Sequence, residues 1–323
     1  MHVFLTGATG FIGGNLLKGL LDVGHTVTAV VRPDTPRKAF LPDESQRLRY
    51  VLGDFYDNRL LKTISGRFDV LIHTAAIRGA GKGERDLYEA VNVEGTRALT
   101  EFALKNEIPR FLYLSTVGVL GTIPEHLPAQ AQDPPRPDNT YHRSKWEAEK
   151  IVHAIPEHAL NTLILRPTIT YGTNDNGFIP RLMAFVKKKR LILPSEPVRI
   201  HLLYVGSLVR LINQILALDL FNNGTYLVAD REAVLLQTIA DLARGFVGGG
   251  YRQLPRFFFD AGDMLFSLLG RADLRTAIQL ISQSWYYDIT PLQKDFLYEP
   301  VDTLETIPEI MAAFQEAGES YRA

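Results

Sequence analysis

A tyrosine and a lysine four positions apart, Tyr141 and Lys145, are the residues of this sequence best suited to proton transfer. Positions i and i+4 share one face of a helix, so the phenol and the ammonium can point into one site. A nearby ammonium favours the phenolate, and we therefore expect Lys145 to lower the pKa of Tyr141 below its usual value of about 10. Tyr141 would then exchange a proton with a substrate hydroxyl near neutral pH. Because Tyr-x-x-x-Lys also arises by chance, its position in the fold decides between this interpretation and a plain exposed helix pair.

The segment before this helix supplies hydroxyl groups for the same site. A strand is predicted at 110–115, and its carboxyl end reads Leu114-Ser115-Thr116. Ligands of open α/β sheets bind outside the carboxyl ends of the strands. Side chains alternate along a strand, so only one of the two hydroxyl groups faces the site. We predict that Thr116 hydrogen-bonds the substrate oxygen, with Ser115 as the alternative.

A glycine-rich turn near the start of the chain predicts the nucleotide site. Gly7, Gly10 and Gly13 follow an apolar run at 3–5 and precede an amphipathic run at 15–21. In such a corner the first glycine permits the tight turn, the second lets backbone approach a pyrophosphate, and the third lets the helix pack closely. Free N–H groups at the helix N-terminus then meet the negative charge. The spacing is GxxGxxG rather than GxGxxG, so the assignment depends on the strand–turn–helix context.

The first half of the chain alternates strand and helix periodicities, which indicates βαβ units and a parallel sheet. Strands are predicted at 26–31, 48–52, 69–73, 110–115 and 162–165, and helices at 84–106 and from 140 onward. We predict an α/β fold with a doubly wound parallel sheet of the Rossmann type and a smaller, mostly helical C-terminal substrate lobe. The dinucleotide-binding domain is placed at 1–171, with 202–229 returning to it through a strand at 224–228. The substrate-binding lobe is placed at 172–201 and 230–323.

The residue that ends the second strand bears on which nucleotide binds. Dinucleotide folds that prefer NAD carry an acidic residue there, which binds the ribose hydroxyls. Here the strand at 26–31 ends on Arg32, with Arg37 and Lys38 close behind. A guanidinium suits a 2′-phosphate, so the sequence favours NADP. NAD is the alternative, with Asp34 reaching the ribose.

The ends of the third and fourth strands complete the predicted cofactor site. Asp54 is placed to hold an adenine amino group, and Ala75 and Ala76 are small enough for the cofactor to lie against the backbone. His73 is interpreted as a packed strand residue, because no second metal-type residue has suitable spacing, and no metal site is predicted.

Composition narrows the class of protein. The chain has 323 residues, a net charge of −1 and no cysteine, so disulfides, thiolate metal sites and cysteine nucleophiles are excluded. The net charge gives no general electrostatic case for nucleic acid or an anionic membrane. Because the first strand starts close to Met1 and no run of about 18 apolar residues occurs, we expect no signal peptide, no membrane span and a cytoplasmic location. The apolar segment 257–269 is either a core helix of the substrate lobe or a membrane contact.

Seven motifs, in order along residues 1 to about 170, resemble those of extended short-chain dehydrogenases/reductases of the NAD(P)-dependent epimerase/dehydratase family. They are Gly7-Ala-Thr-Gly-Phe-Ile-Gly13, Gly53-Asp54, His73-Thr-Ala-Ala76, Asn92-Val-Glu-Gly-Thr96, Leu114-Ser-Thr116, Tyr141-xxx-Lys145 and Arg166-Pro-Thr168. The resemblance implies a catalytic triad of Thr116, Tyr141 and Lys145, a nicotinamide lying against Pro167 and Ile169, and a homodimer formed through the long helices. The predicted cofactor-binding set is Gly7, Thr9, Gly10, Phe11, Ile12, Gly13, Arg32, Asp54, Phe55, Thr74, Ala75, Ala76, Asn92, Tyr141, Lys145, Pro167 and Ile169. For Asn92 a capping or structural role is the alternative.

The second half of the chain departs from the branch of this family that acts on nucleotide-sugars. Those members usually carry an Arg-Asp-aromatic-aliphatic-aromatic-Val segment whose arginine grips a diphosphate. Here 200–205 reads Ile-His-Leu-Leu-Tyr-Val, with Arg199 one place too early. The aromatic residues of the substrate lobe (Phe257, Phe258, Phe259, Phe266, Trp285, Tyr286 and Tyr287) are more typical of a core but also suit an apolar substrate.

The sequence therefore predicts an NADP-preferring oxidoreductase that acts on a small-molecule secondary alcohol or its ketone. The alternative is a nucleotide-sugar epimerase or dehydratase that keeps its cofactor bound through turnover, and a third hypothesis is a nucleotide-binding sensor without turnover. The glycine-rich segment 77–83 is interpreted either as a mobile loop that closes over the substrate or as a plain surface loop.

Overall fold

The computed structural model describes residues 1–35, 41–78, 85–175 and 177–320, with the backbone alone for 317–320. Within these residues, seven strands form one sheet in the order β11-β6-β5-β4-β1-β2-β3. The strands are β1 (His2–Thr6), β2 (Thr26–Val31), β3 (Leu48–Leu52), β4 (Val70–His73), β5 (Arg110–Leu114), β6 (Asn161–Pro167) and β11 (Thr225–Val228). Every pairing in this sheet is parallel. The predicted doubly wound α/β fold is confirmed.

Helices cover both faces of this sheet, because its strands are apolar on both sides. Val3 and Leu5 face the core under α1 (Phe11–Asp22) and α7 (Val205–Leu218), whereas Phe4 faces the opposite core under α4 (Gly95–Lys105) and α5 (Thr140–His153). The long helix predicted at 84–106 is described from residue 85 as α3 (Arg85–Tyr88), a π-helical segment (Glu89–Glu94) and α4. A short helix, α2 (Asn58–Thr63), follows β3.

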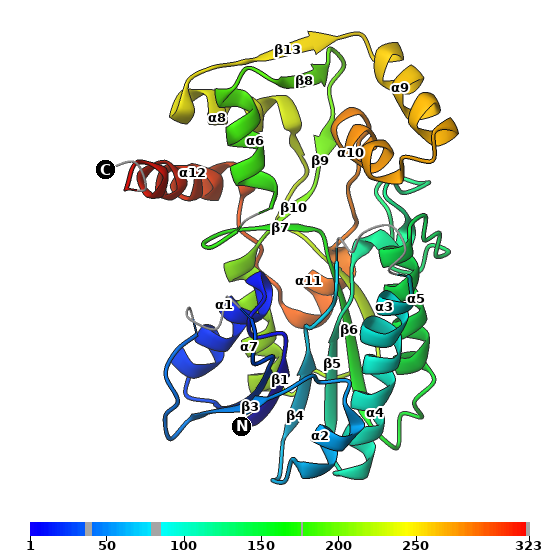
Figure 1. The fold of residues 1–323 in the computed structure, drawn as a ribbon, viewed down its shortest axis with the longest axis vertical. Helices are drawn as coiled ribbons and strands as arrows, with labels where there is room; N and C mark the ends of the chain where they lie inside the picture. Colours follow the sequence, from blue (N-terminus) through cyan, green and yellow to red (C-terminus); the bar gives the residue numbers. More distant parts are fainter. Residues whose placement is uncertain (36–40, 79–84, 176, 321–323) are drawn as a thin grey trace.

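A second, smaller lobe lies beyond the carboxyl ends of the large sheet (Figure 1). Its strands form pairs between β7 (Ile169–Tyr171) and β10 (Leu202–Tyr204), between β9 (Arg199–Ile200) and β12 (Val234–Leu235), and between β8 (Leu191–Pro194) and β13 (Tyr251–Leu254). Its helices are α6 (Phe178–Lys187), α8 (Leu236–Val247), α9 (Phe257–Leu268), α10 (Ala272–Ser282) and α12 (Thr303–Ser320). A separate core that includes Trp285 and Tyr287 holds this lobe together.

The chain crosses between the two lobes more than once. β11 pairs with β6, and α11 (Thr290–Phe296) later packs its Leu292 and Phe296 into the core of the large sheet, a return that the sequence pattern did not predict. Asp230, two residues after β11, links this strand of the large sheet to the smaller lobe. Its fully buried carboxylate accepts hydrogen bonds from the Tyr171 hydroxyl at 2.9 Å, the Tyr204 N–H at 2.8 Å and the Thr303 hydroxyl at 2.7 Å. Burial raises the pKa of Asp230 to about 6 even though these bonds act in the opposite direction.

The α9 segment contradicts one of the two interpretations of residues 257–269. Only Phe259 of this helix is buried, so α9 is not a core helix of the smaller lobe. Along the described residues, no helix combines the length and apolar character needed to cross a membrane.

Candidate functional site

The glycine corner packs directly against the end of β4. Gly7 has a positive φ of 88°, and its carbonyl accepts the Gly10 N–H at 2.8 Å to close the turn. A Cβ on Gly7 would lie 2.6 Å from the Ala75 nitrogen, and one on Gly13 would lie 2.1 Å from the Gly7 oxygen. Any side chain at these two positions would therefore force the β1–α1 turn apart, as the predicted roles of Gly7 and Gly13 require.

This corner leaves a place suited to an anion. Helix α1 begins at Phe11 after the exposed Gly10, and its first turn holds no acidic residue. The unpaired N–H groups of that turn and the positive end of the helix dipole fit a pyrophosphate. Thr9, Phe11 and Ile12 are partly exposed around the turn, so the corner fits the phosphate part of a dinucleotide.

The exit of β4 forms the floor beside the corner. Thr74 donates its hydroxyl proton to the Thr6 carbonyl at 2.8 Å, while Ala75 and Ala76 remain partly or fully exposed. His73 is packed as predicted, with hydroxyl partners Thr6 at 2.7 Å and Thr96 at 3.1 Å. Burial is the main reason why the pKa of His73 lies well below its ordinary value, and the Lys145 ammonium lowers it further. His73 is therefore a neutral strand residue.

Arg32 and Asp54, which follow β2 and β3, both act on the phenol of Tyr56. Burial and the Asp54 carboxylate raise the pKa of Tyr56, and the Arg32 guanidinium acts in the opposite direction. The Arg32 side chain is exposed, and Phe55 lies with its ring centroid 5.2 Å from that of His73. Arg37 and Lys38, the other cations predicted here, lie outside the described residues.

Helix α5 brings Lys145 to the carboxyl end of β5. Asn139 caps the helix by accepting the His142 N–H at 2.9 Å. Two turns further, the Lys145 Nζ donates to the Leu114 carbonyl at 2.7 Å and lies 4.1 Å from the centre of the Tyr113 ring. Lys145 is only 1% exposed, and this burial lowers its pKa to about 7 although the Glu149 carboxylate acts in the opposite direction. The buried amine therefore holds its proton less tightly than an exposed lysine does.

The expected effect of Lys145 on Tyr141 is wrong. Burial raises the pKa of Tyr141 above its ordinary value, and the cation that acts against burial is Arg78. The physical reason is that the Lys145 ammonium is directed to the Leu114 carbonyl, so desolvation of the phenol dominates. Tyr141 is consequently a protonated phenol at neutral pH.

The two hydroxyl groups after β5 differ in their surroundings. Ser115 is buried, and its Oγ has no hydrogen-bond partner among the described residues. Thr116 is partly exposed at the start of a 3-10 turn (Val117–Leu120), where its Oγ1 accepts the Gly118 N–H at 3.1 Å. Accepting that bond leaves the Thr116 hydroxyl proton free to be donated outward.

A buried ion pair joins α5 to the neighbouring strand β6. Arg166 on β6 donates to both oxygens of Glu149 on α5, at 2.9 and 2.6 Å, and both side chains are buried. This bidentate pair holds α5 against β6, and removal of one partner from such a pair typically costs about 3–5 kcal/mol. Glu149 was not singled out from the sequence, although it lies one helical turn beyond Lys145.

Asn92 has the structural role that was kept as an alternative. It lies in the π-helical segment, fully covered, where its amide accepts the Ile77 N–H at 2.8 Å and donates to the Ser144 hydroxyl at 2.8 Å. Asn92 therefore ties the exit of β4 to α5, next to Tyr141 and Lys145. π-Helical turns are frequently found at functional sites.

The effects of Arg78 on Tyr141 and on Asp175 were not predicted. The Arg78 guanidinium acts on the Tyr141 phenol and also lowers the pKa of Asp175, which burial raises. Only its position just after Ala75-Ala76 could have indicated this. Of the segment 77–83, for which a closing loop and a plain surface loop were the two interpretations, residues 79–83 lie outside the described part of the chain. Pro167 is buried at the end of β6, and Ile169 is partly buried in β7.

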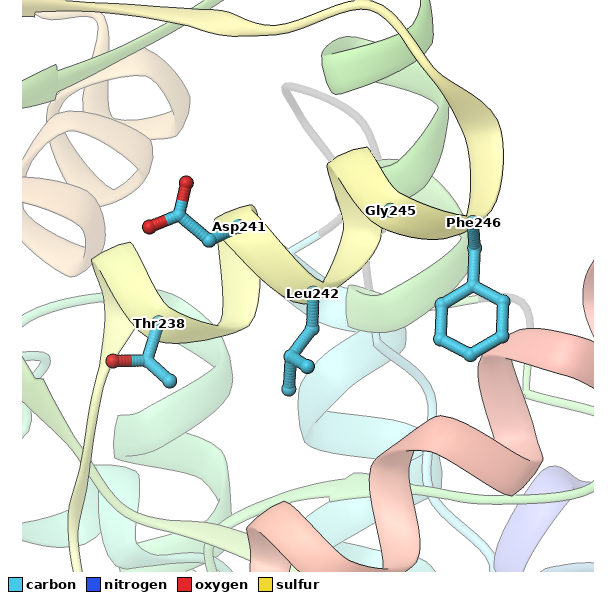
Figure 2. A pocket seen from close by; sticks show the side chains of 5 residues that line it. All are labelled: Thr238, Asp241, Leu242, Gly245 and Phe246. Atoms are coloured by element: carbon cyan, nitrogen blue, oxygen red, sulfur yellow. The ribbon is translucent and has the colours of Figure 1, made fainter.

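A hollow on the surface lies away from this chemistry. It has a volume of about 510 Å³ and lies along α8, lined by Thr238, Asp241, Leu242, Gly245 and Phe246. Figure 2 shows Leu242 and Phe246 pointing from α8 toward a neighbouring helix, whereas Asp241 points away from it. Since none of the predicted site residues lies there, this hollow has no part in the site.

Comparisons with known proteins agree with this geometry. Residues 3–229 match the sequence profile of the NAD dependent epimerase/dehydratase family. A UDP-glucose 4-epimerase of Vibrio cholerae is 27% identical over 98% of this chain and 96% of the relative. A 4-hydroxy-2-methyl-3-oxo-4-farnesyl-3,4-dihydroquinoline-1-oxide ketoreductase of Stigmatella aurantiaca is 30% identical over 59% of this chain, and the match spans little more than half of that relative, 56%.

A solved structure shares the fold over the whole chain. The Bordetella bronchiseptica enzyme WbmH, in complex with NAD⁺, superimposes with a TM-score of 0.76 at 22% identity and covers 99% of both chains. Of the two relatives named above, one is an epimerase and the other a ketoreductase. The protein therefore belongs to the NAD dependent epimerase/dehydratase family.

Proposed function

We propose that this protein is an NADP-preferring oxidoreductase that reduces a ketone to a secondary alcohol or carries out the reverse reaction. The observation that carries the proposal is the position of Tyr141 and Lys145 on α5, with Lys145 bonded to the carboxyl end of β5 beside Thr116. Ligands of doubly wound sheets bind at that edge, on which the glycine corner of β1 also opens. Residues 1–171 with 202–229 are proposed to bind the dinucleotide, and 172–201 with 230–323 to hold the substrate.

Each member of the triad has a distinct part in this proposal. A bound nicotinamide supplies or accepts the hydride, and the predicted cofactor residues around the glycine corner would hold it. Thr116 donates its free hydroxyl proton to the substrate carbonyl oxygen and polarises it. Tyr141 donates the proton that the carbonyl oxygen takes up, a role that suits a phenol that burial keeps protonated at neutral pH. In this proposal Lys145 then reprotonates Tyr141, because burial lowers the pKa of Lys145 to about 7.

A nucleotide-sugar epimerase or dehydratase is the second candidate, and it is favoured by the full-length match to the Vibrio cholerae epimerase. One feature of the chain argues against it. Ile200, which stands where nucleotide-sugar enzymes usually carry the diphosphate-binding arginine, is fully buried in the apolar core of the smaller lobe. A diphosphate would find no cation at that position.

Cofactor exchange separates the two candidates. As purified, the protein is expected to release its nucleotide on gel filtration and to oxidise added NADPH when supplied with an apolar ketone. The measurement is the nucleotide content of the purified protein, followed by a screen of ketones for loss of NADPH fluorescence. Stoichiometric NAD that survives purification, together with interconversion of UDP-sugars without net change in NADH, would replace the reductase by the epimerase.

The choice of NADP over NAD depends on Arg32. Replacing it by alanine is expected to weaken NADPH binding at least about tenfold while changing NADH binding less than about twofold, because the exposed guanidinium pairs with the 2′-phosphate alone. The dissociation constants of both nucleotides, measured by fluorescence titration, check this. Arg49→Ala, at another exposed arginine in the neighbouring strand β3, is the matched control. Equal losses for NADPH and NADH would mean that Arg32 attracts both nucleotides through its charge alone, and the argument for NADP from Arg32 would fall.

The proposed assembly rests on the family resemblance, and the proposed location rests on the lack of an apolar run long enough to span a membrane in the sequence. We propose a homodimer in the cytoplasm, with α4 and α5 at the dimer interface.

A further inference from the structure

Helix α9 presents an apolar stripe to solvent. Met264, Leu265 and Leu268 are 67%, 52% and 76% exposed. The exposed apolar residues of this segment, Phe257, Phe258, Met264, Leu265, Leu268 and Leu269, are confined to a sector about 140° wide at 3.6 residues per turn. An exposed apolar surface of this kind on a soluble protein marks a contact with another molecule or a bilayer.

The stripe faces outward because the opposite side of α9 is anchored. Phe259 is buried on that side, and the Asp263 carboxylate pairs with the Arg275 guanidinium of α10 at 3.1 Å. A Cβ on Gly262 would lie 2.9 Å from Ile278, so the two helices are closely packed there. A rotation of α9 that turned its apolar stripe inward would break this packing.

A cluster of cations lies on the same end of the molecule. Lys187, Lys188, Lys189 and Arg190 are all exposed, and none forms an ion pair with a residue that the structure describes. They lead into β8, which pairs with β13 in the register Leu191 to Tyr251, and β13 leads into α9. In Figure 1 this strand pair runs along the top of the smaller lobe, with α9 at its right-hand end. The overall charge of −1 conceals this local cluster.

We propose that this end of the protein docks on the surface of a lipid bilayer that contains anionic lipid. The stripe of α9 enters the boundary between headgroups and acyl chains, and the cations at 187–190 contact the lipid phosphates. An apolar helix face combined with flanking cations is the arrangement that binds such surfaces without spanning them. A second copy of the chain fits this face less well. The cations precede the parallel strand pair and α9 follows it, so a two-fold contact that spans the whole face would lay the cations of each copy on the apolar stripe of the other and bury charges without partners. This inference is independent of the proposed reaction.

Vesicle flotation tests the proposal with the full chain. The wild-type protein is expected to float with vesicles of phosphatidylglycerol and phosphatidylcholine, and to bind at least tenfold less to phosphatidylcholine alone. The double variant Leu265→Glu/Leu268→Glu is expected to lose at least tenfold in binding, since both side chains are exposed and the fold does not depend on them. Lys188→Glu/Lys189→Glu is expected to lose at least fivefold on anionic vesicles, and added salt should reduce wild-type binding.

A matched control distinguishes binding through this face from nonspecific binding to vesicles. Leu218→Glu, at an exposed leucine that ends α7 on the large domain, is expected to bind vesicles like the wild type. Circular dichroism and the Tm of each variant confirm that it is folded. The proposal is overturned if the wild type does not float, or if the α9 variant floats undiminished. It is also overturned if light scattering shows that the α9 variant dissociates a dimer, which would assign the stripe to a second copy.

Discussion

Replacing Tyr141 by phenylalanine is expected to lower kcat for ketone reduction by about 10²–10⁴-fold, the usual contribution of a positioned general acid. The ring and its contacts are retained, so the binding of cofactor should change little. The expected loss falls on kcat rather than on KM because the hydroxyl proton is transferred in the transition state. Steady-state kinetics with the ketone found in the NADPH screen, together with nucleotide titration of the variant, measure both effects.

Another tyrosine provides the control for this loss. Tyr50→Phe removes a hydroxyl that donates to the Pro42 carbonyl at 2.7 Å, at the opposite edge of the sheet from α5, and it should leave kcat unchanged. A Tyr141→Phe enzyme that turns over at the wild-type rate would remove Tyr141 from the mechanism. The position of α5 would then serve binding alone.

The second large effect is expected at Lys145, where activity and stability should change in opposite directions. Lys145→Met should lower kcat at least about a hundredfold, because the proton source that we propose for Tyr141 is lost. The same change should raise the free energy of unfolding near pH 7 by roughly 1–3 kcal/mol. Methionine fills the space against the Tyr113 ring without a buried charge, although it leaves the Leu114 carbonyl without its lysine donor.

The gain in stability should depend on pH in a defined direction. Burial lowers the pKa of Lys145 from 10.5 to about 7, so the folded state binds this proton less tightly than the unfolded chain does. The penalty is fully present below pH 7 and is lost as the pH rises from 7 towards 10.5, where the unfolded chain also gives up its proton. The advantage of Lys145→Met should therefore shrink over this range.

Urea unfolding of the nucleotide-free proteins at pH 7 and pH 9.5 measures this dependence. Lys150→Met, on the exposed side of the same helix, should change stability by less than about 0.5 kcal/mol at either pH. A Lys145→Met protein that is less stable than wild type at pH 7, or whose advantage grows with pH, would show that the amine is not a buried, destabilised cation.

Local sequence was sufficient for most of the large sheet. The predicted strands at 26–31 and 48–52 coincide with β2 and β3, because each is a short apolar or alternating run bounded by turn residues. Gly7 and Gly13 could be assigned from type and spacing, since backbone clashes at these positions depend on residues close in sequence and on one neighbouring strand. The position of Tyr141 and Lys145 after β5 could also be predicted from the sequence, because a parallel sheet brings the carboxyl ends of its strands to one edge.

Other features depended on contacts between distant residues. Arg78 acts on the Tyr141 phenol, and Asn92 bonds Ile77 and Ser144, only because the sheet brings β4, the π-helical segment and α5 together. The pKa of Tyr141 and the exposure of α9 were predicted wrongly or left open for the same reason. Composition and spacing determined which chemically active side chains this protein contains and on which helix or strand each one lies. Burial, which depends on what packs against each group from elsewhere in the chain, was decided by the tertiary structure alone, and burial controls both proton affinity and contact with solvent.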